Sequence, residues 1–192
     1  MADRMMNRSC FKYSFAKCLK NIFFPDYIML FLQEMRKLSY YKHLKGLARI
    51  LAFWHKYKYR KLSLRLGFSI GCDCFGYGLV IPHYGTIVVG HSNRIGNYAV
   101  LHTSICITDN SKVIGDGLYC STGVKMTSFC TLGDYVSIGA NSLVNKSFAS
   151  NVMIAGLPAT NIKYASPWWE RDGESYIDAV AEVERLRIKM GL

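Results

Sequence analysis

The chain has 192 residues, 51% of them apolar or aromatic and 19% charged, which is enough apolar material for a folded unit and excludes a disordered protein. Its net charge of +11 sits in the first third, because residues 1–66 hold 15 Lys and Arg against 3 Asp and Glu, whereas residues 67–192 hold 9 against 10. The composition therefore predicts a boundary near Gly67, with a basic helical region over residues 1–66.

The first 66 residues show the spacing of helices. Segments 9–20 and 27–62 are predicted to be helical, the second because apolar residues recur every three or four positions and no Pro interrupts it. The apolar residues of that second segment are Leu30, Leu44, Leu47, Ile50, Leu51 and Trp54.

Basic and aromatic residues in this region raise two binding hypotheses. The start FKYSFAKCLKNIFF (11–24) resembles segments that rest on an anionic membrane surface, and KYKYRK (56–61) interleaves basic and aromatic residues as nucleic-acid-binding segments do. No nucleic-acid motif accompanies KYKYRK, so we expect no nucleic acid partner. For the membrane we favour the plainer interpretation, in which the aromatic side chains pack inside and Lys and Arg face solvent. Peripheral contact of residues 1–66 with the inner face of the membrane is the alternative.

The longest apolar run and the cysteines indicate where the protein is located and whether it binds a metal. The longest apolar run, residues 22–32, is short and contains Pro25 and Asp26, so no membrane span is expected. The seven Cys are odd in number, form no CxxC pair and follow no secretory signal, which favours reduced thiols in a cytoplasmic protein. Cys72 and Cys74 flank a single residue, which is poor ligand spacing, so no metal is expected.

From Gly67 onward an apolar residue recurs at every sixth position. One run is Val89, Ile95, Leu101 and Ile107; after a slip of one residue a second run is Ile114, Cys120, Met126, Leu132, Ile138 and Val144. This period fits neither a helix nor the alternation of sandwich strands. It is typical of a parallel β-helix, in which three six-residue faces close one triangular coil. Residues eighteen apart then stack about 4.8 Å from each other. We therefore predict a β-helix over residues 67–163.

The last part of the chain leaves this pattern. The period breaks in NKSFASNVM (145–153), and SPWWERDGES (166–175) leads into a final helix predicted over about residues 173–189. Asp172 or Ser175 is its expected N-cap. Residues 164–192 form a C-terminal extension, whose helix should present one apolar face, comprising Ile177, Val180, Val183, Leu186 and Ile188.

Three segments carry a resemblance to a known family: GLVIPHYGTIVVG (78–90), the hexapeptides that begin IGDG and IGAN, and residues 144–159 with VNKSF and IAGLPA. They resemble the left-handed β-helix acyltransferases with hexapeptide repeats. Within that family the similarity is to the serine acetyltransferase branch and its relatives that O-acetylate capsular polysaccharides or exopolysaccharides. Over about residues 67–163 the resemblance implies a left-handed parallel β-helix, trimers with active sites between neighbouring prisms, and acetyl-CoA as co-substrate.

The resemblance also implies roles for individual residues. A His at the position of His83 acts in the family as general base on the acceptor hydroxyl, which suits imidazole because it titrates near neutrality. His102, Tyr84 and Asp109 are the acceptor-site candidates. Both His83 and His102 have a plainer interpretation as surface histidines without a role. A Cys nucleophile is the weaker hypothesis, because no Cys has a base beside it in sequence, and Cys120 and Cys130 fit inward positions.

Acetyl-CoA is expected to lie along the coils, where backbone amides beside small residues can bind its pantetheine arm. A basic residue near the end of the coils would meet a CoA phosphate. Each of these positions equally has a structural interpretation, as a small turn residue or a solvated Lys. The candidates that the resemblance implies are Thr122, Gly123, Gly139, Ala140, Asn145, Lys146 and Lys163.

Departures from the serine acetyltransferases bear on the acceptor. Those enzymes have Asp fifteen residues before the catalytic His, where this chain has Phe68, and Asp73 is the only acid upstream in the β segment. The residue just before His83 is Pro82 instead of an acid, and the segment between Ile107 and Ile114 has no room for the Gly-rich loop of the family.

These departures favour direct acetyl transfer from acetyl-CoA to a hydroxyl of a sugar or polysaccharide precursor. Serine O-acetylation for cysteine biosynthesis and a non-catalytic β-helix scaffold are the alternatives. A homotrimer is expected, or a hexamer if the N-terminal helices pair two trimers.

Overall fold

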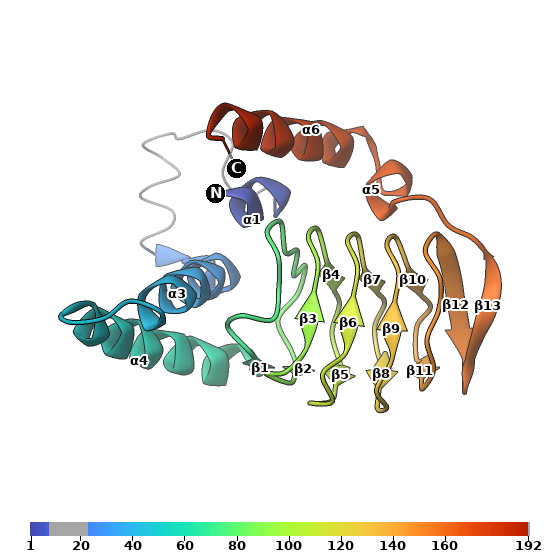
Figure 1. The fold of residues 1–192 in the computed structure, drawn as a ribbon, viewed down its shortest axis with the longest axis horizontal. Coiled ribbons are helices and arrows are strands. Elements are labelled where there is room, and N and C mark those ends of the chain that lie inside the picture. Colours follow the sequence, from blue (N-terminus) through green and yellow to red (C-terminus); the bar gives the residue numbers. More distant parts are fainter. Residues whose placement is uncertain (8–22, 192) are drawn as a thin grey trace.

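A computed structural model describes residues 1–7 and 23–191 of the chain. It places helices at one end of a stack of short strands, and the chain then returns along one side of the stack to its last helix (Figure 1). The predicted helix over residues 9–20 and most of the segment 11–24 lie outside the described residues.

Three parallel sheets form the faces of a triangular prism. Sheet A has the order β1-β2-β5-β8-β11 and sheet B the order β3-β6-β9, while sheet C runs β4-β7-β10-β12 and ends in the antiparallel strand β13. The strands of sheet A are β1 (Phe68–Ile70), β2 (Ile87–Val89), β5 (Ile105–Ile107), β8 (Lys125–Met126) and β11 (Leu143–Val144). Sheet B comprises β3 (Arg94–Ile95), β6 (Val113–Ile114) and β9 (Thr131–Leu132). Sheet C comprises β4 (Val100–Leu101), β7 (Tyr119–Cys120), β10 (Ser137–Ile138), β12 (Val152–Gly156) and β13 (Ala159–Tyr164).

The register of these sheets explains the hexapeptide pattern. Ile87 pairs with Ile105, eighteen residues on, whereas Arg94 pairs with Val113, nineteen residues on. The extra residue lies in the turn between β5 and β6, where the sequence pattern slips by one and Ser111 has a positive φ of 51°. The predicted β-helix is therefore confirmed, including the position of the slip.

The predicted inward residues form the core. All ten hexapeptide positions, Val89, Ile95, Leu101, Ile107, Ile114, Cys120, Met126, Leu132, Ile138 and Val144, are at most 4% exposed. Burial of an aliphatic side chain of this size contributes roughly 1.5–3 kcal/mol. The apolar residues at every sixth position therefore make the main stabilising contact between successive coils.

The predicted helix over 27–62 is wrong in its extent, because two helices occupy this region. They are α3 (Tyr27–Lys42) and α4 (Ala48–Leu66), which pack side by side at the N-terminal end of the prism (Figure 1). Gly46, with a φ of +69°, lies in the turn between them and adopts a conformation that other residues rarely allow. Three apolar residues of the predicted spacing face solvent, since Leu47, Ile50 and Trp54 are 83%, 67% and 51% exposed.

One arginine of α3 bonds both to the N-terminal helix α1 (Ala2–Met6) and to the first coil. Arg36 Nε and Asp3 Oδ2 lie 2.7 Å apart, and the same guanidinium donates to the carbonyls of Phe75 and Gly76 at 2.8 and 2.5 Å. Asp3 in turn accepts the N–H of Leu79 at 2.9 Å. The beginning of the chain thus completes the hydrogen bonding of the first coil.

The C-terminal segment covers the outer side of sheet C. The short helix α5 (Trp168–Arg171) leads into α6 (Glu174–Lys189), which agrees within one residue with the predicted final helix. The predicted cap is wrong, because Gly173 is the N-cap and no side chain caps it. A second cluster of buried side chains joins α6 and α1 to sheet C; it comprises Met5, Met6, Val80, Tyr98, Val100, Trp168, Ala179 and Val183.

Among the residues described, no helix has both the length and the apolar character needed to cross a membrane.

Candidate functional site

The turns that connect sheet C to sheet A form one edge of the prism, which we call the C–A edge (residues 82–86, 102–104, 121–123 and 139–142). Successive turns are hydrogen bonded along this edge. The N–H of Gly123 donates to Thr103 O at 3.0 Å, and the N–H of Asn141 donates to Thr122 O at 2.9 Å. His83 and His102 occupy the first two turns, with ring centroids 6.3 Å apart. The fold therefore brings together His83, His102, Tyr84, Thr122, Gly123, Gly139 and Ala140 on one edge.

The two histidines differ in environment. His83 is exposed, while His102 is half buried and its Nε2 lies 3.0 Å from the Tyr119 hydroxyl. Burial lowers the pKa of His102 from its ordinary value of 6.5, and the neighbouring His83 lowers this pKa further. A neutral His102 next to His83 allows a hydrogen bond in either direction with Tyr119, depending on the tautomer.

The C-terminal segment supplies residues to this edge that the sequence did not predict. The Arg171 guanidinium lies 4.3 Å from the centre of the Tyr119 ring and pairs with Asp172 at 2.8 Å. Asp172 raises the pKa of His102 and Arg171 lowers it, although both effects are smaller than that of burial. The Trp168 Nε1–H donates to Tyr98 O at 2.8 Å and anchors this segment. Tyr119 could have been found from the coil register, whereas Arg171 and Asp172 follow the repeat and carry no such signal.

Asp109 lies away from the histidines. It follows β5, at the opposite end of the sheet A strands from the C–A edge, and its Oδ1 accepts the N–H of Ser92 at 2.6 Å. Hydrogen bonds from Ser92 lower the pKa of Asp109. The structure thus does not bring this acceptor-site candidate to His83.

The candidate CoA residues divide into two groups. Thr122, Gly123, Gly139 and Ala140 lie on the C–A edge, where Gly123 has a φ of +80° and an added Cβ would be 2.0 Å from Asn141 Oδ1. Asn145 and Lys146 follow β11 at the other end of sheet A, where Lys146 Nζ lies 5.5 Å from the centre of the Phe148 ring. Lys163 is exposed on β13, where it is paired with Met153.

No carboxylate occupies the position expected from the serine acetyltransferases. Phe68 is 5% exposed and packs edge-on against Phe31, with ring centroids 5.1 Å apart. Asp73 forms an ion pair with Lys42 and lies 3.5 Å from His43 Nε2. This acid is therefore held at α3 and does not partner His83.

The cysteines of the described region are free thiols. Burial raises the pKa of the Cys120 and Cys130 thiols, and raises that of Cys74 to about 11. Because the thiolate is the nucleophile, these buried thiols are poorly suited to attack a thioester. Within residues 1–7 and 23–191, no group of three or more His, Cys, Asp or Glu could hold a metal ion.

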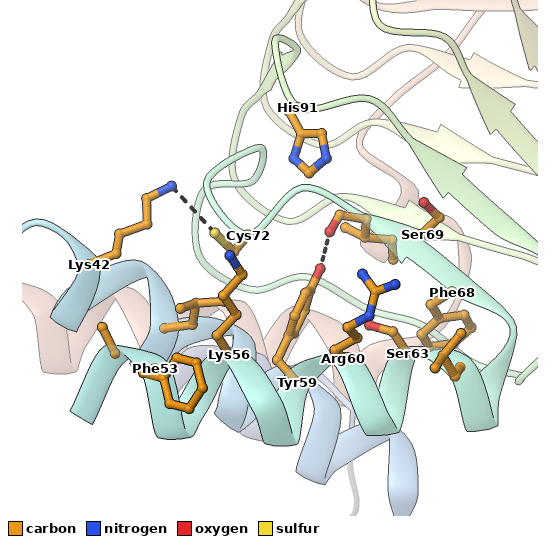
Figure 2. Close-up of a pocket in the computed structure, with 14 residues that line it drawn as sticks. Lys42, Phe53, Lys56, Tyr59, Arg60, Ser63, Phe68, Ser69, Cys72 and His91 are labelled. Atoms are coloured by element: carbon orange, nitrogen blue, oxygen red, sulfur yellow. Dashed lines mark hydrogen bonds between the residues drawn. The ribbon is translucent and has the colours of Figure 1, made fainter. Parts of the chain in front are cut away.

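A cavity of about 620 Å³ lies away from the C–A edge, between α4 and the first coil. Figure 2 shows Tyr59 extending from α4 into it, with Lys56 and Arg60 from the same helix and His91 opposite. The Tyr59 hydroxyl donates to Ile70 O. The cavity contains none of the candidate site residues named above.

Part of the chain is similar in sequence to curated serine acetyltransferases. A serine acetyltransferase from Staphylococcus xylosus is 30% identical over 95 residues, which cover 46% of this chain and 44% of the relative. A serine acetyltransferase from Haemophilus influenzae is 30% identical over 91 residues, which cover 44% of this chain and 34% of the relative. The match thus spans less than half the length of these relatives. No protein-family model matches the sequence.

Solved structures share the fold. A serine O-acetyltransferase from Brucella melitensis superposes with a TM-score of 0.65 at 21% identity, covering 86% of this chain and 67% of that one. Soybean serine acetyltransferase gives a TM-score of 0.63 at 22% identity, covering 84% and 66%. A serine acetyltransferase solved in complex with CoA gives 0.59 at 23% identity, covering 69% and 55%. The chain is therefore a hexapeptide-repeat β-helix protein whose coils are similar in sequence and in fold to those of the serine acetyltransferases.

Proposed function

We propose that this chain is an acetyl-CoA-dependent O-acetyltransferase with His83 as its general base. The observation that carries the proposal is the C–A edge, where an exposed His83 lies 6.3 Å from His102 and on the same edge as a row of small residues. The similarity of the coils to serine acetyltransferases supports the same activity.

The proposed reaction is a direct transfer in a ternary complex. The neutral imidazole of His83 takes the proton from the acceptor hydroxyl as its oxygen attacks the thioester carbonyl of acetyl-CoA. Collapse of the tetrahedral intermediate breaks the C–S bond and forms the ester. The CoA thiolate then receives the proton from His83, so no acetyl-enzyme forms and the imidazole ends neutral.

His102 supports this role through its charge state. Because burial lowers its pKa, His102 stays neutral at pH values where an exposed His begins to be protonated, and it adds no positive charge beside His83. In the absence of an Asp at position 68, Tyr119, Arg171 and Asp172 form the polar surroundings of His102. We propose that Tyr119, Arg171 and Asp172 hold His102 in place beside His83.

Acetyl-CoA fits the row of small residues on the C–A edge. Gly123, Gly139 and Ala140 carry no side chain or a single methyl group, so a pantetheine arm can lie close to the backbone of this edge. Asn145, Lys146 and Lys163 are proposed to meet the nucleotide end, which would lie beyond this edge. A relative of this fold has been solved in complex with CoA.

Serine is the first acceptor to test, because the similar curated proteins described above are serine acetyltransferases and a Neisseria gonorrhoeae structure of this fold was solved with serine. A sugar or polysaccharide hydroxyl is the second candidate. It is favoured by Phe68 in place of the expected Asp and by the short turn between β5 and β6.

We also propose that the active unit is a trimer. In one chain His83 and Tyr84 are exposed, Tyr84 by 75%, so a single prism offers no enclosed acceptor site. A neighbouring prism packed on the C–A edge would enclose the reaction and exclude water. Light scattering coupled to size exclusion gives the mass that tests this assembly.

The experiment for the proposed function uses the full chain with isotopically labelled acetyl-CoA and two acceptor sets. One set is free serine, and the other contains sugars, nucleotide sugars and glycans, with the products identified by mass. Label on serine assigns the serine acetyltransferase activity, and label on a saccharide assigns the second candidate. No product with any acceptor, together with no binding of acetyl-CoA by titration, would leave the non-catalytic scaffold as the function.

A further inference from the structure

Helix α4 has an apolar face that its own protein does not cover. The inner face of α4 packs on α3 and the first coil through His55, Tyr59, Leu62 and Leu66. On the opposite side, residues spaced by three and four positions form what we call the outer stripe: Ile50, Phe53, Trp54, Tyr57 and Leu64. Their exposed fractions are 67%, 76%, 51%, 54% and 75%. Phe53, Trp54 and Tyr57 therefore present aromatic surface to solvent.

Basic residues flank the outer stripe on both sides. At about 100° per residue, Arg49, Lys56 and Arg60 lie along one border and Lys58 and Arg65 along the other, while Lys61 falls within the stripe. Lys58 Nζ lies 5.0 Å from the centre of the Trp54 ring, so charge and aromatic surface are in contact. The helix contains no Asp or Glu.

We propose that the outer stripe of α4 docks on the surface of an anionic lipid bilayer. Trp and Tyr rings favour the boundary between headgroups and acyl chains, and Lys and Arg beside an apolar face meet lipid phosphates. The helix lies in the plane of the surface, because its inner face stays packed on α3 and the first coil. This docking involves residues described by the structure and does not depend on the segment 11–24.

The cavity beside α4 extends the same surface. Phe53 and Leu64 of the outer stripe also line this cavity, together with Lys56 and Arg60. Figure 2 shows Lys56 and Arg60 flanking Tyr59 along one side of α4. A lipid phosphate next to the outer stripe would therefore lie close to two cations at the edge of the cavity. Because the cavity is recessed, a phosphate entering it would approach both cations more closely than a phosphate on a flat surface.

Charge argues for lipid over a second copy of this chain. Two α4 helices placed face to face would bring basic borders together with no acidic residue on either helix to offset them. A nucleic acid would satisfy the basic borders but would leave the apolar stripe in water. An anionic bilayer satisfies both the charges and the apolar side chains.

The test uses the full chain with vesicles of phosphatidylcholine alone and of phosphatidylcholine mixed with phosphatidylglycerol. We expect co-sedimentation with the mixed vesicles and little with the neutral ones, and we expect the binding to weaken as salt is raised. The tryptophans give a local readout, because Trp54 lies in the outer stripe at 51% exposure, whereas Trp168 and Trp169 lie on α5, away from the stripe. Binding should shift the emission to the blue and make it quenchable by brominated lipid, and Trp54→Phe should remove most of this change.

Matched variants separate the stripe from general charge. The double variant Ile50→Ser with Phe53→Ser and the double variant Lys56→Gln with Arg60→Gln should each lower vesicle affinity at least tenfold. Ile188→Ser and Lys189→Gln on α6 change equally exposed residues far from the stripe and should bind like the native chain. Circular dichroism confirms that each variant is folded.

Three outcomes would overturn the proposal. Vesicle binding that is absent, or that is equal in the stripe variants and the α6 controls, would exclude docking through α4. A lower mass by light scattering in the Ile50→Ser, Phe53→Ser variant would assign the stripe to a contact between copies. Binding of duplex DNA that competes with vesicles and is lost in the Lys56→Gln, Arg60→Gln variant would assign the basic borders to nucleic acid. Acetyl transfer to a dissolved acceptor should be unchanged in all these variants, so the docking and the proposed function fail independently.

Discussion

His102 is the residue whose ionisation the structure most clearly perturbs near neutral pH. Burial lowers the pKa of His102 below 6.5, the value an unfolded chain would show, so the unfolded chain binds more protons as the pH falls below that value. The neutral form therefore contributes stability above pH 6.5, and this contribution is lost as the pH falls toward the folded pKa.

We expect the free energy of unfolding to decline between about pH 7 and pH 5 more steeply in the native protein than in His102→Gln. Urea unfolding followed by circular dichroism at several pH values measures this slope. His91→Gln is the control, because no hydrogen bond through the His91 ring is found in the described structure. Equal slopes in the native protein and His102→Gln would contradict the assigned shift.

Ala140 tests the proposed course of acetyl-CoA. The side chain is exposed next to Gly139, at the end of the row of small residues on the C–A edge. Ala140→Trp should raise the Kd for acetyl-CoA at least tenfold, because a large ring would occupy the surface where the pantetheine arm is proposed to lie. Thr131→Trp, exposed on sheet B, should leave the affinity unchanged. Unaltered binding by Ala140→Trp in a calorimetric titration would place the co-substrate elsewhere.

At the residue scale the sequence was informative where the repeat set positions and uninformative elsewhere. His83, His102 and Gly123 could be assigned to one edge because the coil period fixes which residues stack. Arg171 and Asp172 reach Tyr119 and His102 only because the chain folds back over sheet C after the repeat has ended. A contact of that kind has no period, and so no pattern in the sequence predicts it.

Helix α3 depends on a guanidinium that a lysine cannot replace. Arg36 pairs with Asp3 through two nitrogens, at 2.7 and 3.0 Å, and also donates to two carbonyls of the first coil. A Lys offers one ammonium without this planar geometry. Arg36→Lys should therefore lower the free energy of unfolding by about 1.5–3 kcal/mol.

Thermal unfolding measures this loss, at roughly 2–4 °C in Tm for each kcal/mol in a chain of this size. Arg49→Lys, an exposed substitution on α4, is the matched control and should change Tm by no more than about 1 °C. A Tm for Arg36→Lys within that range would show that the four hydrogen bonds do not hold α1 and α3 to the coils.

The pair formed by Glu34 on α3 and His55 on α4 predicts that stability depends on pH. Burial alone would raise the pKa of Glu34, but hydrogen bonds from His55 at 2.6 Å and Lys37 at 3.2 Å outweigh it and lower the pKa below 4.5. A carboxyl with a lowered pKa contributes stability above the unfolded pKa, and loses it as the pH falls through the folded value.

Glu34→Gln should cost about 1 kcal/mol at neutral pH, because a neutral amide makes a weaker hydrogen bond than a carboxylate. The difference from the native protein should shrink as the pH falls below about 4.5. Chemical unfolding at pH 7 and pH 4 provides the comparison, with Glu174→Gln, exposed at the start of α6, as the control. A difference that is constant across this pH range would contradict the role of the Glu34 charge.

The bounds of a helix could be predicted from the sequence only where a regular apolar spacing begins and ends with the helix. The bounds of the final helix were predicted within one residue, since its apolar residues recur regularly every three or four positions. The predicted helical segment over 27–62 was wrong in its extent, because apolar residues recur at helical spacing on both sides of Gly46, where the chain turns. On α4, Ile50 and Trp54 of this spacing lie on the exposed face.

At the scale of the whole molecule, the hexapeptide period was sufficient to predict the β-helix. It did so because every coil buries the same positions, and a repeated constraint is easier to read than a single contact. The hexapeptide period gives no information about which other elements pack on the outside of the prism. The attachment of α1 through Asp3, the position of α6 on sheet C and the exposed outer stripe of α4 all depend on contacts between different elements.

The proposed trimer also belongs to this scale. If neighbouring prisms meet on the C–A edge, a bulky charged residue there should separate them without unfolding the chain. Tyr84→Asp, at a side chain that is 75% exposed in one chain, should lower the mass measured by light scattering from a trimer to a monomer and reduce acetyl transfer with it. A trimer that survives Tyr84→Asp with full activity would place the subunit contact on another face.

The central claim is that His83 removes the proton from the acceptor hydroxyl, and one comparison tests it most directly. The kcat for acetyl transfer and the Kd for acetyl-CoA are measured for the native chain and for His83→Gln, whose exposed position makes a folding defect unexpected. The account predicts a fall in kcat of about 10²–10⁴-fold with a Kd within about twofold of the native value. A normal kcat in His83→Gln would contradict the account and return the C–A edge to a structural role.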